Sequence, residues 1–386
     1  MKCLYCGENP IPHTSHWLFE SMDIFMQPIK ERIFYGSIGK PFDWLAETIL
    51  MTLYYGLRGL GLVKHNNDPK AIPYDRGRVL TEEAVKRNIE FLEIKPFGRS
   101  LDFYRFKKNG KVEFFQGLPR PKGDWKNISW IDDKHRLKQV LSKHNLPHAK
   151  GGTFTNLKQA LECFHNLTKP VIIKPRLGSR GRHTTTFITN KEDFIKAFHI
   201  AKQLCHWVIV EEQLFGPIYR GTVVGNILVG VLGGSPPQIT GDGEKTIKEL
   251  IIEKNKTRHE KQGEVNITEH LENFLRRNGM DIDTVLNLAQ TIDLSEKIGV
   301  RYGGTSFDAT DDTHPDTKLM LIEAAKTVNV PILGFDFIIP DITKSYKEQK
   351  CGIIECNGAP FINLHHDVMI GKPINAAKYV WDLVLR

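Results

Sequence analysis

From about residue 132 onward, apolar runs of strand length alternate with segments in which apolar residues recur at helical spacing. We predict a helix from Asp132 and Asp133 to about Asn145, because leucine and valine recur there at the spacing of one helix face. Continuous apolar runs predict strands at residues 170–175 and 207–211. This alternation is typical of an α+β fold.

Further elements follow from the same two patterns. Asn156 and Asn190 are predicted to cap helices, since a side-chain oxygen can accept hydrogen bonds from the first helical turn. Valine, isoleucine and glycine at residues 219–240 predict a hairpin with turns at Gly225-Asn226 and Gly233 to Pro237. Four more helices are predicted near 246–254, at 268–278 with Thr268 as its cap, at 316–328 and at 373–383.

Residues 1–130 have the least regular pattern. GRSLDFYRF and KVEFF, on either side of Asn109-Gly110, predict a hairpin. The apolar segment ETILMTLYYGL is shorter than the ~18 to 20 residues that cross a bilayer, so we predict a core helix there. We divide the chain into an N-terminal domain at 1–130, a central lobe at 131–215 and a C-terminal lobe at 216–386.

Two predicted strands near the C-terminus carry polar residues that a purely structural strand would not need. Asp336 interrupts the apolar run GFDFIIPDI, and Glu355 and Asn357 lie in IIECNGAP. An unpaired charge in an apolar strand is costly, and oxygen ligands of this kind suit Mg²⁺ held between protein and nucleotide phosphates. We therefore predict a Mg²⁺ or Mn²⁺ site at these three residues. Alternation along the strand places Cys356 on the opposite face from Glu355.

A glycine-rich turn follows the apolar strand that ends at Lys174. Glycine lets backbone N–H groups approach a phosphate closely, and the lysine and arginines supply positive charge. The spacing differs from the GxxxxGK[ST] of a P-loop, so a different nucleotide fold is expected. Besides Lys174, the residues predicted to bind the nucleotide phosphates are Gly178, Ser179, Arg180, Gly181 and Arg182.

Taken in order, these motifs resemble the ATP-grasp ligases, with the ATP-grasp modules of cyanophycin synthetase and of bifunctional glutathione synthetase as the nearest likeness. The resemblance runs from about Asp132 to the C-terminus and includes WVIVEEQLFGPIYR, ITGDGEKTIKELI and YGGTSFDATDDTHPD. It implies an α+β ATP-grasp fold, in which two α+β lobes grip ATP, preceded here by a separate N-terminal domain. It also implies an ADP-forming carboxylate–amine ligase that uses ATP and Mg²⁺.

The resemblance assigns roles to single residues on the nucleotide side. It implies that Lys174 meets the phosphates and the adenine side. It also implies that Glu211, Glu212 and Leu214 belong to the hinge that grips adenine. A snorkelling surface lysine and a solvated acidic pair are the alternative interpretations.

On the substrate side, the resemblance implies that Arg220 and Arg301 steady an acylphosphate or a substrate carboxylate, and that Arg258 anchors a carboxylate. A surface arginine is the alternative for each. The sequence departs from its relatives at Ile218, where they usually carry an acidic residue for the ribose. It also departs at His183, where cyanophycin synthetases have glycine. Substrate choice is therefore left open.

Composition and charge narrow the class of protein. The chain has 386 residues, a net charge of +8 and 25% charged residues, which is ordinary for a globular enzyme of two or three domains. Lysine and arginine are spread along the chain and not gathered in a block, which favours nucleotide and acidic substrates over nucleic acid. Six scattered cysteines predict no disulfide framework. With no signal-like apolar segment at the N-terminus, we expect a cytoplasmic location and no membrane partner.

The first residues contain a candidate Zn²⁺ site. Cys3, Cys6, His13 and His16 are two soft and two borderline ligands that could close a tetrahedral site. The gap between Cys6 and His13 is shorter than that of zinc fingers, so ordinary reduced thiols are the alternative.

The function expected from the sequence is an ATP-dependent ligase that forms an amide or peptide bond through an acylphosphate. The expected partners are an amino acid or a short peptide, and a homo-oligomer is left open. No second ligase module follows Arg386 in this sequence, so we expect a single addition and not the making of cyanophycin. The alternatives are an ATP-binding protein without ligase activity and, less favoured, a basic zinc-containing RNA-binding protein.

Overall fold

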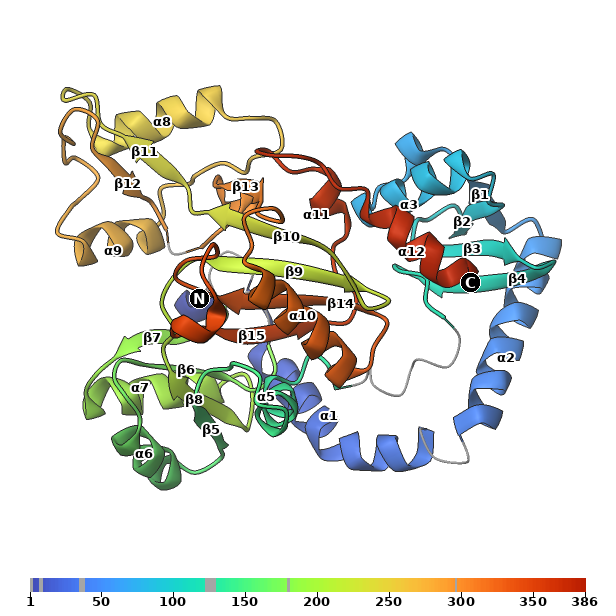
Figure 1. Ribbon diagram of the computed structural model, residues 1–386, viewed down its shortest axis with the longest axis horizontal. Helices are drawn as coiled ribbons and strands as arrows, with labels where there is room; N and C mark the ends of the chain where they lie inside the picture. Colours follow the sequence, from blue (N-terminus) through green and yellow to red (C-terminus); the bar gives the residue numbers. More distant parts are fainter. Residues whose placement is uncertain (1–2, 7–9, 35–38, 122–129, 179–180, 296) are drawn as a thin grey trace.

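The computed structural model describes residues 3–6, 10–34, 39–121, 130–178, 181–295 and 297–386. Within these ranges, four antiparallel sheets are packed with helices (Figure 1). None of the helices in the described ranges combines the length and apolar composition that a bilayer crossing requires.

The sheet of the central lobe has the strand order β5-β8-β6-β7. Its strands are β5 (Gly151–Phe154), β6 (Val171–Pro175), β7 (Thr185–Ile188) and β8 (Val208–Glu212). Helices α6 (Leu157–Asn166) and α7 (Lys191–Lys202) cover one face, and Asn156 and Asn190 cap them as predicted. Alternate residues of β6 and β8 enter the core under these helices, which leaves the other face of the sheet for chemistry.

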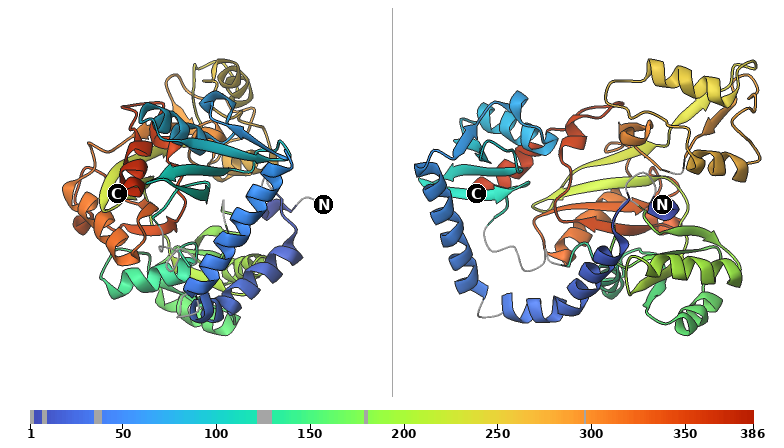
Figure 2. Two further views of the ribbon diagram at one scale, coloured as in Figure 1. Left: turned by 90° about the vertical axis from the view of Figure 1, so that its right-hand side faces the viewer. Right: turned by 180° about the vertical axis from the view of Figure 1, so that it is seen from behind.

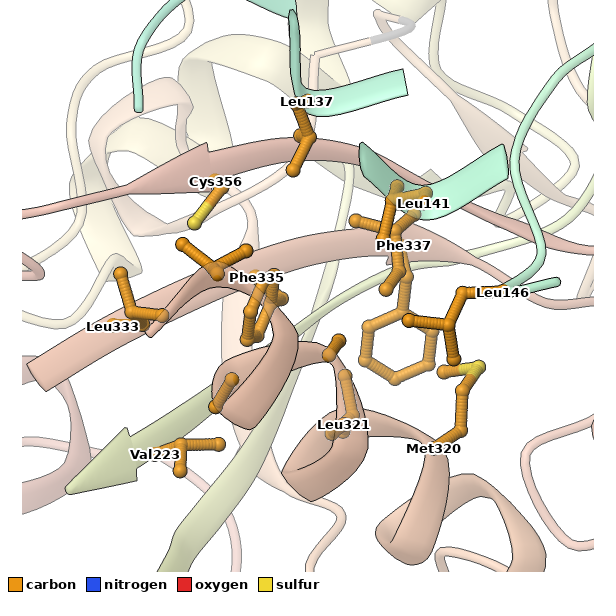
Figure 3. Packing of buried hydrophobic residues seen from close by; sticks show 14 of the residues in the cluster. Leu137, Leu141, Leu146, Val223, Met320, Leu321, Leu333, Phe335, Phe337 and Cys356 are labelled. Atoms are coloured by element: carbon orange, nitrogen blue, oxygen red, sulfur yellow. The ribbon is translucent and has the colours of Figure 1, made fainter. Parts of the chain in front are cut away.

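A five-stranded sheet forms the centre of the molecule, with the order β13-β10-β9-β14-β15. Its strands are β9 (Ile218–Val224), β10 (Ile227–Ser235), β13 (Thr305–Asp308), β14 (Ile332–Ile338) and β15 (Gly352–Asn357). Helices α5 (Lys134–Lys143) and α10 (Pro315–Val328) pack against one face. Figure 3 shows Phe335, Phe337 and Cys356 from the sheet meeting leucines of both helices. Asp133 caps α5, and the predicted helices at 132–145 and 316–328 are confirmed.

A small module extends from the end of β10 (Figure 1). It contains β11 (Gln238–Thr240), β12 (Thr291–Asp293), α8 (Ile247–Thr257) and α9 (Glu269–Arg277). Thr246 forms a capping box with Glu249 at the start of α8, and Thr268 caps α9 as predicted. The module has its own small apolar core.

The remaining sheet belongs to the N-terminal part of the chain and has the order β1-β2-β3-β4. Its strands are β1 (Val63–Asn66), β2 (Phe91–Pro96), β3 (Phe103–Lys108) and β4 (Lys111–Gln116), and the predicted hairpin is confirmed. The sheet packs with α3 (Asp75–Lys86) and with the last helix, α12 (Ala376–Leu385), around the fully buried Trp381. Residues from both ends of the sequence therefore share one core. The division at residues 131 and 216 stays a prediction.

Two long helices, α1 (His13–Phe34) and α2 (Gly39–Gly59), form an arm between the central lobe and the N-terminal sheet (Figure 2). The segment ETILMTLYYGL is helical, but the prediction of a core helix is wrong. Ile49 and Leu53 are 59% and 57% exposed, while Tyr54 is buried. In the part of α2 whose side chains the structure describes, from Thr48 onward, Leu50 and Tyr55 are also exposed, so much of its apolar surface faces outward. The short elements are η1 (Leu4–Cys6), η2 (Pro69–Ala71), η3 (Val300–Tyr302), η4 (Tyr346–Glu348) and α11 (Asn363–His366).

The last helix begins at Ala376, three residues later than predicted. The side chain of Asn375 accepts a hydrogen bond from the backbone N–H of Lys378 and caps the helix there. Pro373 therefore lies before the helix, in a segment without regular secondary structure. Asparagine is a better N-cap than the proline signal used in the prediction.

Leu321 tests whether the core beneath the central sheet holds the fold. It is fully buried on α10 and would contact any side chain placed at Gly221 of β9. Leu321→Ala should lower the free energy of unfolding by about 2–5 kcal/mol, because it removes apolar contacts and leaves a cavity. The control is Leu319→Ala on the same helix, where the side chain is 63% exposed; it should change stability by less than about 0.5 kcal/mol. Chemical denaturation of both variants measures this, and equal losses would contradict the assigned core.

Candidate active site

The register of β14 brings the first two predicted metal ligands together. Asp336 pairs with Glu355 of β15 on one side and with Arg220 of β9 on the other. Because Phe335 and Phe337 enter the core, Asp336 lies on the opposite face of the sheet. On β15 the same alternation sends Cys356 into the core, as predicted, and leaves Glu355 on the face of Asp336. Sequence alternation alone therefore gathers these carboxylates on one face.

Arg220 and Asp336 form a two-point ion pair. The Nε of Arg220 donates to Oδ1 at 2.7 Å and its Nη2 donates to Oδ2 at 2.8 Å. Burial opposes the charge on Arg220, but the hydrogen bonds that it donates to Asp336 and the charges of Asp336 and Glu355 raise its pKa overall. The pair holds the Asp336 carboxylate in a fixed orientation, and each oxygen keeps a further lone pair for another ligand.

Lys174 is the last residue but one of β6 and is buried on the face of the central-lobe sheet away from α6 and α7. It forms an ion pair with Glu211 of β8, and Lys138 of α5 meets the same carboxylate. Two lysine side chains thus share one buried carboxylate. Glu211 therefore positions both lysine nitrogens.

The pKa of Lys174 is lowered to about 7. Burial is the main cause, the charge of Lys134 adds to it, and Glu355 opposes it. Burial and the charges of Lys174 and Lys134 also lower the pKa of Lys138. These mutual effects show that three lysines and the β15 carboxylate share one electrostatic environment. An incoming polyanion would favour the charged form of each lysine.

The start of the glycine-rich turn is held by two contacts with the beginning of α5. Lys134 Nζ donates to the carbonyl of Gly178 at 2.8 Å, and Arg176 pairs with Asp133, the cap of α5. Gly178 and Gly181 have φ angles of +139° and +65°, which glycine adopts far more readily than other residues. Ser179 and Arg180 lie outside the described residues. The structure thus fixes the turn against the first turn of α5.

The turn and the metal strands line one cavity of about 410 Å³. Its walls come from four parts of the chain that lie far apart in sequence. They include Glu355 and Asn357 from β15, Leu177 and Gly178 from the turn, Asp132, Asp133 and Lys134 at the start of α5, and His16, Glu20, Asp23 and Gln27 from α1. Glu355 and Asn357 of β15 thus share one cavity with Leu177 and Gly178 at the start of the glycine-rich turn.

The donor set in this cavity fits a hard divalent cation. Glu355 and Asn357 offer a carboxylate and an amide oxygen, and Asp336 lies beside Glu355 across the strand pair. The Nδ2 of Asn357 is buried and has no hydrogen-bond partner among the described residues. That amide is not used to hold the fold, so its orientation is available to a ligand.

Helix α1 contributes acidic groups to the same cavity, which the sequence analysis did not foresee. Burial raises the pKa of Glu20, and the neighbouring Asp23 adds to the effect while Lys134 opposes it. Burial also raises the pKa of Asp132. The cavity is therefore lined by Lys134 of α5 and by several acidic groups, among which Glu20 and Asp23 of α1 form an acidic wall.

Glu212 and Leu214, the two other predicted hinge residues, lie away from Glu211 and its lysine partners. Glu212 accepts from Lys350 at 2.8 Å and from the backbone of Thr168, and it lines a different cavity together with Leu214. Alternation along β8 explains this, because Glu211 and Glu212 point to opposite faces. Roles for Glu212 and Leu214 in adenine binding stay predictions.

The predicted substrate residues Arg258 and Arg301 lie outside the cavity walls. Arg258 ends α8, donates to the carbonyls of Asn255 and Gln262, and pairs with Glu264 at 3.1 Å. These contacts hold a loop, as expected for the alternative of a surface arginine. The role of Arg258 as a carboxylate anchor stays a prediction. Arg301 is exposed in η3, and its assigned role stays a prediction.

Lys134 and Lys138 were missed by the sequence analysis. They stand four residues apart on the helix that Asp133 opens, so both project from one face. Their helical spacing could have shown that the two lysines share one face, but the sequence analysis interpreted only the apolar side of that helix.

The predicted Zn²⁺ ligands are only partly brought together. Cys3, Cys6 and His13 lie with His183, all four ligand atoms being within 4.8 Å of one another. His16 is not in this group; it lines the cavity and lies 3.7 Å from Glu20. One helical turn separates His13 from His16, and the fold supplies the fourth ligand from the end of the glycine-rich turn.

Comparison with known proteins places the chain among a defined set of relatives. No protein-family model matches it. It is 30% identical over 317 residues to the glutathione biosynthesis bifunctional protein of Clostridium perfringens (strain 13 / Type A), covering 80% of this chain and 40% of that protein. It is 31% identical over 263 residues to the cyanophycin synthetase of Synechocystis sp. (strain ATCC 27184 / PCC 6803 / Kazusa), covering 65% and 30%.

Among solved structures, a bifunctional glutathione synthetase from Pasteurella multocida superimposes with a TM-score of 0.59 at 25% identity. That match covers 80% of this chain and 43% of the other. The chain therefore spans less than half the length of each of these relatives.

His365 provides a test of the packing behind Arg220. It is fully buried, its Nε2 lies 2.7 Å from Thr222 Oγ1, and its Nδ1 has no partner among the described residues. Burial, with smaller effects from His366 and Arg220, lowers its pKa to about 3. In the unfolded chain this histidine has a pKa of ~6.5, so between pH 3 and pH 6.5 the unfolded chain binds more protons than the folded chain. The contribution of His365 to stability is therefore complete above pH 6.5 and is lost as the pH falls toward 3.

Wild type should accordingly lose about 2 kcal/mol of unfolding free energy through this group between pH 7.5 and pH 5.0. In His365→Asn that part of the pH dependence should vanish, whereas the exposed His144→Asn should retain it. Urea denaturation at the two pH values measures the difference. Parallel pH dependence in wild type and His365→Asn would mean that this histidine is not held neutral.

Proposed function

The chain belongs to the ATP-grasp ligase family, and from the geometry of its cavity we propose that it is an ATP-dependent carboxylate–amine ligase. The observation that carries the proposal is that Glu355 and Asn357 face Gly178 and Lys134 across one cavity. Such a cavity offers oxygen ligands for a cation on one side and positive charge with backbone groups for phosphates on the other.

The proposed reaction proceeds through an acylphosphate. A substrate carboxylate oxygen attacks the γ-phosphorus of ATP, the bond to the β-bridging oxygen breaks, and ADP leaves. The nitrogen of an amine then attacks the acyl carbon, phosphate leaves, and the nitrogen loses a proton. The result is an amide bond, ADP and phosphate. Phosphoryl transfer of this kind depends mainly on positioning and on neutralising charge.

Residues in and near the cavity would divide this work. Lys174 and Lys138, held by Glu211, would attract the phosphates and neutralise the developing charge. Arg220, fixed by Asp336, lies near Glu355 and would steady the acylphosphate. Gly178 and Gly181 would let backbone N–H groups approach the phosphates.

A Mg²⁺ ion would be held by Asp336, Glu355 and Asn357. When bound, it would supply positive charge that offsets the negative charge of the nucleotide phosphates. The Arg220 contact leaves Asp336 in a single orientation, which suits a ligand that must keep its place during phosphoryl transfer.

The substrates are proposed to be an amino acid or a short peptide. The relatives named above are a glutathione biosynthesis protein and a cyanophycin synthetase, and both names denote products built from amino acids. The acidic wall formed with Glu20 and Asp23 suits an amine, which would be attracted as its ammonium form. Incubation with ATP, Mg²⁺ and a panel of amino acids and short peptides, followed by phosphate release, tests the class.

Glu355→Gln separates a metal ligand from a structural strand residue. The substitution keeps size and hydrogen bonding but removes the charge, so amine-stimulated phosphate release should fall by at least about 100-fold. The matched control is Glu348→Gln in η4, an exposed carboxylate outside the cavity walls, which should keep wild-type turnover. Wild-type turnover in Glu355→Gln would remove this residue from the mechanism. Nucleotide binding with no turnover in wild type under any substrate would leave only an ATP-binding protein.

A further inference from the structure

The first turn of the chain meets the glycine-rich turn at a cluster of thiols and imidazoles. Cys3 Sγ and Cys6 Sγ each lie 3.5 Å from His183 Nε2, and Cys6 Sγ lies 3.2 Å from His13 Nε2. Cys6 and His183 are 5% and 1% exposed, and both cysteines are free thiols. Four potential ligand atoms therefore converge in a largely buried place.

These separations match those of a tetrahedral zinc centre. With Zn–S bonds of ~2.3 Å and Zn–N bonds of ~2.0 to 2.1 Å, neighbouring sulfur and nitrogen ligands lie about 3.5 Å apart. Three sulfur–nitrogen separations in the cluster are 3.2 to 3.5 Å, and all four ligand atoms lie within 4.8 Å of one another. A set of two thiols and two imidazoles is also a donor set that favours Zn²⁺ over harder cations.

His183 is held in the orientation that a ligand needs. Its Nδ1 lies 2.8 Å from the carbonyl of Ile200, which can only accept, so Nδ1 carries the proton and Nε2 presents its lone pair to the thiols. Its backbone N–H donates to the carbonyl of Tyr5 at 3.0 Å. His183 also has a φ of +51°, a conformation that disfavours side chains and costs about 1 kcal/mol or more. An imidazole kept at such a position needs a compensating interaction.

We propose that Cys3, Cys6, His13 and His183 bind one Zn²⁺ ion, which ties the N-terminal segment to the glycine-rich turn. Three ligands come from residues 3–13 and the fourth from the central lobe. The ion would thus act as a cross-link between two parts of the chain that are 170 residues apart in sequence, counting from His13 to His183. Binding of this kind contributes directly to the folding of the segment that it closes.

The cross-link would hold helix α1 over the nucleotide cavity. Between α1 and the central lobe, the described apolar cluster joins Ile24 with Leu177, Cys205 and Trp207, and the ring of Trp17 meets that of His206 edge-on. The backbone N–H of His206 donates to Ser21 Oγ at 3.3 Å. Small apolar contacts rarely suffice to hold a segment, and a structural metal is a common supplement. The metal would therefore keep Glu20 and Asp23 in the cavity wall.

Metal content tests the zinc site without an activity measurement. The zinc proposal can therefore fail or succeed independently of the proposed ligase function. Protein purified without chelators should contain one zinc per chain by elemental analysis. After removal of zinc, added Co²⁺ should give the intense absorption of tetrahedral thiolate-bound cobalt. Sub-stoichiometric zinc without the cobalt spectrum would overturn the proposal. So would a Cys3–Cys6 disulfide, found by mass spectrometry in place of metal.

Variants distinguish this ligand set from its neighbours. Cys6→Ser and His183→Gly should lose zinc, and glycine relieves the backbone strain at residue 183, so a failure to fold does not explain the loss. His16→Asn and Cys163→Ser should keep zinc, since neither residue belongs to the cluster. Full zinc in His183→Gly would overturn the assignment, and loss of zinc in His16→Asn would return that residue to the ligand set.

The consequence for α1 is measured by limited proteolysis. Removal of zinc by a chelator should speed cleavage within residues 1–34 by about 10-fold or more while the rest of the chain stays resistant, since about 1.4 kcal/mol of lost anchoring corresponds to a factor of ten. Re-addition of Zn²⁺ should restore resistance. Unchanged cleavage after complete zinc removal would show that the ion does not hold α1.

Discussion

The placement of β14 between β9 and β15 is the constraint on which the rest of the site depends. A strand paired on both edges has one apolar face in the core, here Phe335 and Phe337, and a second face that can carry charge only if a partner neutralises it. Arg220 provides that partner for Asp336. A slip of one residue in this register would exchange the two faces and bury the carboxylate in the core.

The sheet of the central lobe also has one apolar face and one face that carries charged residues. Alternate residues of β6 and β8 enter the core below α6 and α7, and this leaves Lys174 and Glu211 on the opposite face of the sheet. Helix α5 contacts both sheets. Its leucines pack in the core of the central sheet, while Lys134 contacts the glycine-rich turn and Lys138 contacts Glu211 of the central-lobe sheet. The cavity is therefore a consequence of packing two sheets against one helix, with the charges placed where neither core could accept them.

The sequence allowed much of this to be predicted, because its strongest signals are local. Alternation placed Cys356 opposite Glu355, and caps such as Asn156 and Thr268 marked helix starts. Tertiary pairing was harder: nothing local to His183 links it to Cys6, and the contact exists only because the N-terminal turn crosses to the central lobe. Helix α2 was placed in a core because its apolar residues were counted without knowing that one side of the arm lacks neighbours among the described residues.

The central claim is that the β15 oxygens and the glycine-rich turn together form a metal-dependent nucleotide site. Calorimetric titration with a non-hydrolysable ATP analogue, in the presence and absence of Mg²⁺, tests it most directly. The account predicts one site per chain whose affinity falls at least about tenfold without Mg²⁺, a change of about 1.4 kcal/mol. The absence of binding with Mg²⁺, or binding of equal affinity without it, would contradict the account.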